Sequence, residues 1–167
     1  RLARDELEAR VESRTAELGK ASEQMRQRAM QLQAVAEVAR AIASEQDLER
    51  LLPLITRTIS ERFGFYHVGI FLVDELKEYA VLRAANSAGG ARMLARNHKL
   101  RVGQVGIIGF VTAQGQPRLA LDVGKDAFFF DNPDLPLTRS EIGIPLKVRG
   151  EVIGALDAQS TQSSAFT

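Results

Sequence analysis

Two stretches in the second half of the chain carry the side chains best suited to bind a small molecule, and the first is aromatic. Residues 126–133 contain Phe128, Phe129 and Phe130 beside aspartate and asparagine. Three consecutive rings offer a flat or apolar molecule a large contact area. The same rings suit a minor core beneath a long loop, because at least one of them must be buried for stability. Both interpretations stay open.

The second stretch places a fixed cation beside hydroxyls and a carboxylate, just before an apolar strand pattern: Thr138, Arg139, Ser140 and Glu141. A guanidinium binds anions with two parallel hydrogen bonds, so Arg139 could hold an anionic ligand. Alternatively it pairs with Asp122 or Glu141 and fastens the loop to the strand that follows. The internal pairing explains the residue without any ligand.

The sequence gives little indication of a metal site, a phosphate-binding loop or a catalytic site. The absence of cysteine excludes a disulfide framework, a thiolate nucleophile and a cysteine-based zinc site. His67 and His98 have no ligand-like spacing, so we expect surface or strand-flanking roles and no metal site. Gly103, Gly106 and Gly109 lack the Lys-Ser/Thr ending of a phosphate-binding loop. No catalytic residue is predicted, and we expect no enzymatic activity.

The composition restricts the classes of partner that the chain is expected to bind. The 22 Lys and Arg residues almost balance the 21 Asp and Glu residues, which argues against nucleic acid as a partner. No apolar run has the length of a signal peptide or a membrane span, so we expect a cytoplasmic fragment without direct membrane contact. The chain begins with Arg1 rather than Met, which suggests a piece of a larger protein whose anchor could lie upstream.

The first 43 residues have the pattern of a dimerising helix. Apolar side chains recur every seven residues at positions that would form one seam, namely Leu7, Val11, Leu18, Met25, Leu32, Val35 and Ile42. Arg14 and Arg28 interrupt one of the two seam rows, so we expect two copies to pair marginally and to be able to shift register. A solvated single helix, or a helix folded onto its own domain, is the alternative.

The remaining chain alternates helix and strand signals. We expect a break near residues 44–48, with Asp47 capping a second helix that Gly64 ends. The strands are expected at 66–73, 79–85, 118–123, 141–148 and 151–159, with a further short helix or strand within 92–102. A short helix is expected at 107–113, a loop at 124–139 and a tight hairpin turn at Arg149 and Gly150.

Six segments in order resemble a GAF domain: Val68–Asp74, Gly106–Val111, Gly115–Pro117, Asp122–Val123, Thr138–Leu146 and Gly150–Asp157. The resemblance implies an α/β (α+β) fold with an antiparallel sheet of about six strands, helices on one face and a small-molecule pocket on the other. It also implies a closing C-terminal helix, which this chain would lack. We therefore divide the chain into a signalling helix, 1–43, and a GAF domain, 44–167.

The resemblance places loops over the pocket and so implies its residues. We expect ligand contacts from Phe71, Asp122, Phe128, Phe129, Phe130, Thr138, Arg139, Ser140 and Glu141. Sulfoxide reduction and covalent bilin attachment in this family need cysteines, which are absent. The ligand is therefore expected to bind noncovalently, and neither its identity nor any cofactor is indicated.

The helix around residues 11–18 resembles the connector that follows a HAMP module in membrane-bound sensor histidine kinases. Together the two resemblances imply a sensor in signal transduction, such as a two-component system, that works as a homodimer and relays ligand binding to an output domain. The alternative is a ligand-free module that only dimerises and transmits strain.

Overall fold

The structure is a computed structural model that describes residues 1–126 and 129–166. For residues 37–38 and 41–46 it describes the backbone and not the side chains. The chain divides into two compact units, Arg1–Asp47 and Leu48–Thr167, which are treated separately below.

The first unit is helical throughout. Residues 2–47 of this unit belong to helix α1, Leu2–Phe63, which continues into the second unit. The six described side chains of the expected seam are exposed in the single chain: Leu7, Val11, Leu18, Met25, Leu32 and Val35. The side chain of Ile42, the seventh, lies outside the described residues.

The expected break near residues 44–48 is wrong. Helix α1 continues through it to Phe63, so Asp47 does not cap a second helix. The segment holds no Gly or Pro, and nothing in it forces the backbone out of helical geometry. Pro53, which removes one backbone donor, stands at an exposed position where water can hydrate the carbonyl left without a partner.

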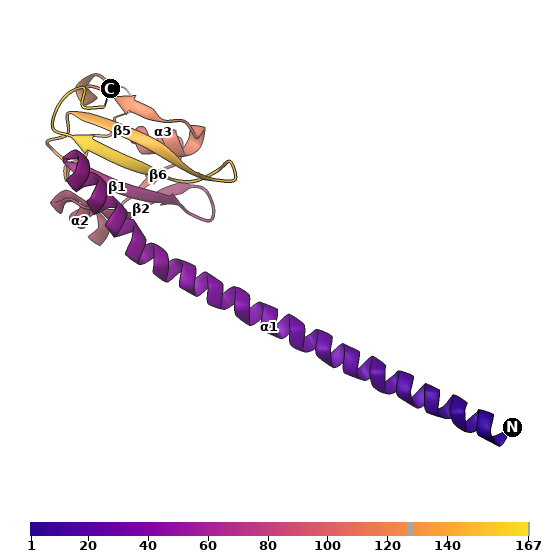
Figure 1. Cartoon of the computed structure of the whole chain (residues 1–167). Helices are drawn as coiled ribbons and strands as arrows, with labels where there is room; N and C mark the ends of the chain where they lie inside the picture. The colour runs from indigo at the N-terminus through magenta and orange to yellow at the C-terminus, as the bar shows by residue number, and fades with distance from the viewer. Residues whose placement is uncertain (127–128, 167) are drawn as a thin grey trace. The chain divides into compact units, whose positions relative to one another are not determined.

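The second unit is built on a six-stranded antiparallel sheet, as expected, with the order β3-β2-β1-β6-β5-β4 (Figure 1). Its strands are β1 His67–Val73, β2 Tyr79–Ala85, β3 Lys99–Arg101, β4 Arg118–Ala120, β5 Ser140–Val148 and β6 Glu151–Ser160. Its further helices are α2 Ala88–Ala95, α3 Gly106–Gln114 and the short 3₁₀ helix η1 Val123–Lys125.

The hairpin between β5 and β6 is confirmed at its predicted turn. Arg149 and Gly150 have φ angles of 52° and 79°, the left-handed pair of a type I′ turn. Glycine adopts such an angle without steric cost, and the turn matches the twist of the strands beside it. The longest ladder of the sheet follows, from Val148 opposite Glu151 to Ser140 opposite Ser160.

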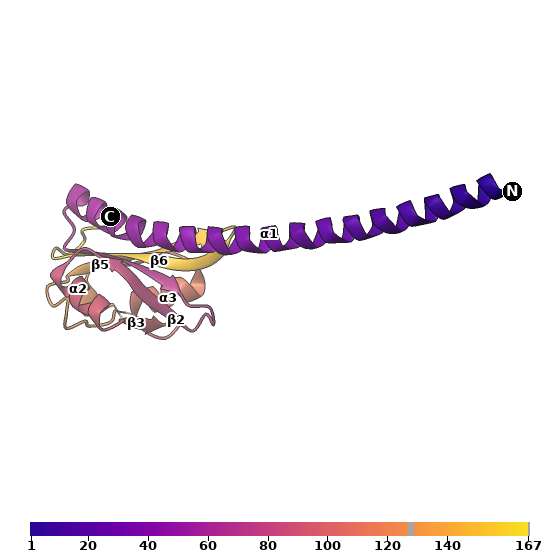
Figure 2. The same cartoon turned by 90° about the horizontal axis from the view of Figure 1, so that it is seen from below.

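The two faces of the sheet are covered differently (Figure 2). Residues 48–63 of α1 lie on one face, where Leu52 packs against Ile70 and Ala84. Helices α2 and α3 lie on the other, in the larger cluster that contains Phe71. Adjacent residues of β1 thus enter opposite cores, because successive side chains of a strand point to opposite faces.

Among the described residues, no helix combines the length and apolar character that crossing a membrane requires.

Candidate functional site

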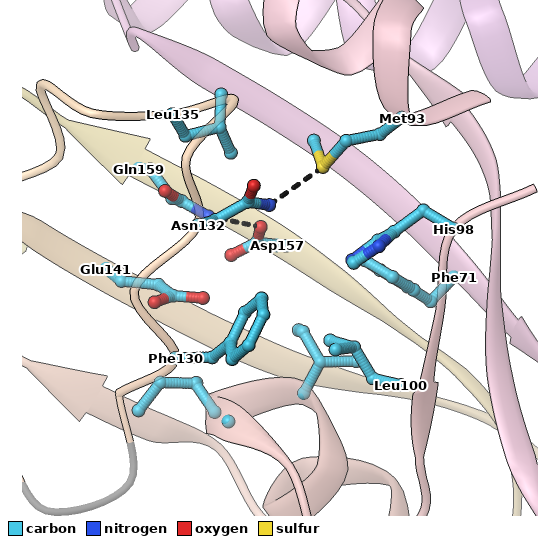
Figure 3. Close-up of a pocket in the computed structure, with 13 residues that line it drawn as sticks. Phe71, Met93, His98, Leu100, Phe130, Asn132, Leu135, Glu141, Asp157 and Gln159 are labelled. Carbon is cyan, nitrogen blue, oxygen red and sulfur yellow. Dashed lines mark hydrogen bonds between the residues drawn. The ribbon is translucent and has the colours of Figure 1, made fainter. Parts of the chain in front are cut away.

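A small cavity lies on the sheet face that carries α2 and α3 (Figure 3). Its walls come from the sheet, from α3, from the α2–β3 connection and from residues 129–139, which we call the strap. The lining residues are Phe71, Met93, His98, Leu100, Gly106, Ile107, Ile108, Phe130, Asn132, Leu135, Glu141, Asp157 and Gln159. The cavity volume is about 20 Å³, enough for about one water molecule.

Two carboxyl groups form the polar floor of this cavity. Glu141 on β5 lies opposite Gln159 on β6, and Asp157 comes two residues earlier on β6, so all three side chains share one face. Glu141 is 5% exposed and Asp157 is 2% exposed. Figure 3 shows both carboxyl groups pointing into the same space.

Burial decides the protonation of this pair. Burial, followed by the neighbouring Asp157 carboxyl, raises the pKa of Glu141 well above its ordinary value. Burial also raises the pKa of Asp157, while His67 and hydrogen bonds from Glu141 and Gln159 oppose that rise. Glu141 therefore keeps its proton at pH values where an exposed glutamate has lost it, and the pair shares this proton.

A chain of amide and hydroxyl groups orients Asp157. The Thr138 hydroxyl donates to Gln159 Oε1 at 2.5 Å, and Gln159 Nε2 donates to Asp157 Oδ2 at 2.7 Å. The Thr138 contact fixes which end of the Gln159 amide faces the carboxyl group. The other oxygen, Asp157 Oδ1, is buried. Within the described residues, no amide, hydroxyl, Lys or Arg group donates a hydrogen bond to it.

His67, the first residue of β1, lies beside the floor without neutralising it. Its side chain is fully buried, and its Nδ1 lies 2.7 Å from the Ser87 hydroxyl that caps α2. Its Nε2 is 3.8 Å from Asp157 Oδ2, too far for a hydrogen bond, and has no partner. Burial lowers the pKa of His67 more than Asp157 raises it, so the ring stays neutral.

Glycines on both neighbouring strands leave space around Asp157. Gly69 on β1 and Gly143 on β5 both lie opposite it. A Cβ on Gly143 would come within 2.9 Å of Ile107 and Val111, so the missing side chain lets α3 approach the sheet. A Cβ on Gly69 would meet the His67 ring at 3.1 Å. The floor therefore depends on these two small residues.

Contacts with α2 hold the strap in place. Asp134 forms ion pairs with Arg92, at 3.0 Å, and with Arg96. Asn132 is buried and donates from Nδ2 to the Met93 sulfur at 2.9 Å. These contacts keep the strap closed over the cavity.

Three rings form the aromatic side of the cavity. His98 lies between Phe71, at a centroid distance of 6.1 Å, and Phe130, at 6.5 Å. Burial, then the nearby Arg96 charge, then His67, lower the pKa of His98, so it is neutral at physiological pH. The pocket thus combines aromatic walls with an acidic floor.

Some of the expected ligand-binding residues meet at this cavity. Phe71, Phe130 and Glu141 line it. Thr138 stands one hydrogen bond behind the floor, through Gln159. Ser140 is buried, but its hydroxyl donates to the Gln162 carbonyl at 2.6 Å.

The structure places other expected residues away from the cavity lining. Arg139 is exposed and donates to the Ser163 hydroxyl at 3.1 Å, and within the described residues neither Asp122 nor Glu141 forms an ion pair with it. Asp122 caps η1 by accepting from the Gly124 amide at 3.3 Å. Phe129 is half-buried. Phe128 lies outside the described residues.

Sequence reasoning missed Asp157, Gln159 and both histidines as part of the site. Of the two roles expected for His67, surface or strand-flanking, the surface role is wrong, because the residue begins β1 and is fully buried. One signal was available. Asp157 interrupts the run from Val152 to Ala158, and a charged residue within an otherwise apolar strand is rarely buried without a role.

Comparison with known families identifies the second unit. The family described as GAF domain matches residues 47–167. The chain belongs to the GAF domain family. A curated relative, GAF domain-containing protein A of Dictyostelium discoideum, is 30% identical over 112 residues, which are 67% of this chain. The matched part covers 65% of that relative's length.

Solved structures show the same fold. The free methionine-R-sulfoxide reductase of Neisseria meningitidis, solved with its substrate, is 28% identical with a TM-score of 0.62, over 76% of this chain and 71% of the reductase. The GAF domain of a Coxiella burnetii phosphoenolpyruvate-protein phosphotransferase has a TM-score of 0.64 at 24% identity, over 79% and 80% of the two chains. GAF domains are generally sensory or regulatory modules, but these neighbours include enzymes.

Proposed function

We propose that residues 48–167 form a sensory GAF domain that binds a small molecule noncovalently beneath the strap. The observation that carries this proposal is the polar floor of Glu141, Asp157 and Gln159 at the bottom of a cavity whose other walls are mostly apolar and aromatic. A few polar groups converging in an apolar pocket are typical of ligand sites. The similarity to a reductase solved with its substrate supports a small molecule in this fold.

The ligand must open the site before it binds. Pockets for organic ligands usually measure about 300–1,000 Å³, whereas this cavity measures about 20 Å³. Phe130 is 40% exposed, and part of the hold of the strap on α2 comes from ion pairs with partly exposed arginines. Displacing the strap gives binding a conformational consequence, which a sensor needs.

We further propose that helix α1 pairs with that of a second copy and passes this change to an output domain of a larger, cytoplasmic or membrane-anchored signalling protein such as a histidine kinase. The exposed apolar row along residues 7–35 supports this homodimer. Coupling needs a difference of only about 1–3 kcal/mol in ligand affinity between two helix arrangements.

We propose that the domain acts without catalysis. Reduction of a sulfoxide in this fold would require a redox-active thiol, and this chain contains no cysteine. The Ser87 hydroxyl lies 2.7 Å from His67 Nδ1, but it caps α2, accepts from the Gly90 amide and is not among the residues that line the cavity.

The near-filled cavity favours a second candidate, a ligand-free module that dimerises and transmits strain. Screening the full chain by thermal shift against nucleotides and aromatic and amine metabolites separates the two. A saturable rise in the unfolding temperature supports the sensor. If no compound stabilises the domain and the strap stays closed, the ligand-free module is the better description.

A cysteine introduced into this cysteine-free chain tests the relay directly. Lys20 lies off the expected seam, so a spin label on Lys20→Cys reports the distance between two paired helices without disturbing the contact. We expect a single short distance distribution that shifts when a stabilising ligand is added. A ligand that stabilises the domain and leaves the distance unchanged would contradict the relay.

A further inference from the structure

The carboxyl groups of the cavity floor have no counter-charge. In the described part of the chain, no Lys or Arg nitrogen lies within 4.0 Å of Glu141 or Asp157. Arg118, on the neighbouring β4, pairs with Asp126 at 3.2 Å. Arg92 and Arg96 are engaged by Asp134. Buried carboxyl groups normally have a paired cation, and here the protein supplies none.

The proton that Glu141 retains is the substitute for this cation. It lets Glu141 donate to Asp157, but it brings no positive charge and leaves His67 Nε2 buried without a hydrogen-bond partner. Leaving such a group unsatisfied costs about 1–3 kcal/mol. The floor is therefore suited to a ligand group that carries both a positive charge and several hydrogen-bond donors.

The surrounding walls suit the same kind of group. His98, Phe71 and Phe130 border the cavity, and aromatic faces attract cations in desolvated sites. Helix α3, which closes another side, contributes no charged residue. Asp126, which is paired with Arg118, is close enough to Glu141 to raise its pKa further.

From this geometry we infer that the pocket selects organic cations, with a protonated primary amine seated between Glu141 and Asp157 and its carbon chain against Phe130 and His98. The inference rests on the proposed small-molecule function and narrows its ligand class. An ammonium group has three donors, enough to reach both carboxyl groups and one further acceptor, such as Gln159 Oε1.

Binding of the amine should release a proton. The ammonium replaces the shared proton, so the Glu141 carboxylic acid becomes a carboxylate and one proton leaves to solvent for each ligand bound. The amine itself keeps its charge, because the pKa of an alkyl ammonium is about 10. Affinity should therefore rise with pH up to the pKa of Glu141, by about tenfold per pH unit.

The test uses the full chain and three probes, namely propylammonium chloride, benzylammonium chloride and neutral benzyl alcohol. NMR titrations in phosphate buffer at pH 5.5, 6.5 and 7.5 give the dissociation constant of each probe and locate it from the His98 and Gln159 side-chain signals. We expect both ammonium probes to bind more tightly as the pH rises, and benzyl alcohol to bind weakly at every pH.

The variant Glu141→Gln tests whether binding requires a carboxylate at this position. Glutamine resembles protonated glutamate in shape and can donate to Asp157, so the free variant should be about as stable as the parent chain below about pH 5 and no less stable than it near pH 7. It cannot become a carboxylate, so benzylammonium should bind at least about 30-fold more weakly and lose its pH dependence. Glu151→Gln, an exposed carboxylate in the β5–β6 turn region, is the matched control and should bind like the parent chain.

Each of the other outcomes would contradict either the cation inference or the proposed small-molecule function. If benzyl alcohol binds as tightly as benzylammonium, or binding does not change with pH, the cation inference is wrong and the small-molecule function stands. The same holds if the ammonium probes fail and a neutral or anionic metabolite stabilises the domain. If no compound of any class binds, the proposed function itself is wrong.

Discussion

The first unit exposes apolar groups, whereas the cavity of the second buries acidic ones. Leu18 and Leu32 are 69% and 71% exposed, while Asp157 is 2% exposed. Each arrangement reverses the usual distribution and costs free energy in the single chain. Each unit is therefore suited to a different kind of partner. An apolar row is suited to another protein surface, and an acidic floor is suited to a small polar molecule.

The largest expected effect concerns the apolar row. Replacing both Leu18 and Leu32 with glutamate should raise the dimer dissociation constant by more than about 100-fold, because each pair of buried leucines contributes several kcal/mol to a helical interface. Light scattering across a concentration series measures it. Lys20→Glu with Gln27→Glu, which adds the same number of glutamates off the seam, is the control. A parent chain that is monomeric at high concentration would refute the dimer outright.

The same substitution at two glycines should have opposite signs in the two units. Gly143→Ala should lower the free energy of unfolding by about 1–3 kcal/mol, because its Cβ meets Ile107 and Val111 at 2.9 Å. Gly19→Ala meets nothing within 4 Å in the middle of a helix and should stabilise it by about 0.5–1 kcal/mol. Urea unfolding measures the first effect and helical circular dichroism the second. Equal tolerance at both sites would mean that α3 does not pack closely on β5.

Releasing the strap should have a smaller effect. Asp134→Asn removes both ion pairs to α2 and should lower the free energy of unfolding by about 1 kcal/mol or less, because both arginines are largely exposed. It should also speed association and dissociation of any ligand that must displace the strap. Stopped-flow binding measures both rates. Unchanged rates would show that the ligand enters elsewhere.

The smallest expected effect is that of Glu141→Gln on the stability of the free domain below about pH 5. Because the folded-state pKa of Glu141 is raised, its contribution to stability is complete below the pKa of an exposed glutamate and declines as pH rises toward the folded value. The lowered pKa of His67 has the opposite effect, because the stability that the neutral ring contributes is lost at acidic pH. This effect is the same in the parent chain and in the variant. Unfolding across pH 4–9 should therefore show a steeper decline above about pH 5 in the parent chain than in the variant. Parallel curves would show that Glu141 is ionised throughout.

The sequence could predict the elements of the fold and part of the candidate site. The helix of residues 2–43, the strands and the turn at Arg149 and Gly150 follow from periodicity and turn chemistry, which act between near neighbours in the chain. Phe71, Phe130 and Glu141 were accessible through the family resemblance. The continuity of α1 past residue 44 was missed because the end of the seven-residue apolar pattern was interpreted as the end of the helix.

By itself, then, the sequence determined most of the helix and strand segments, the family and the exposed apolar row, since local backbone preference and side-chain period depend on near neighbours in the chain. It left residues 92–102, where α2 ends and β3 lies, undecided between helix and strand. Only the tertiary structure decided that Glu141 and Asp157 share a floor, that His67 is buried beside them and that Asp134 fastens the strap to α2. Those facts depend on strand register and on contacts between residues up to 90 positions apart, such as His67 and Asp157. Burial, which shifts the pKa values of the carboxyl groups, exists only once those contacts have formed.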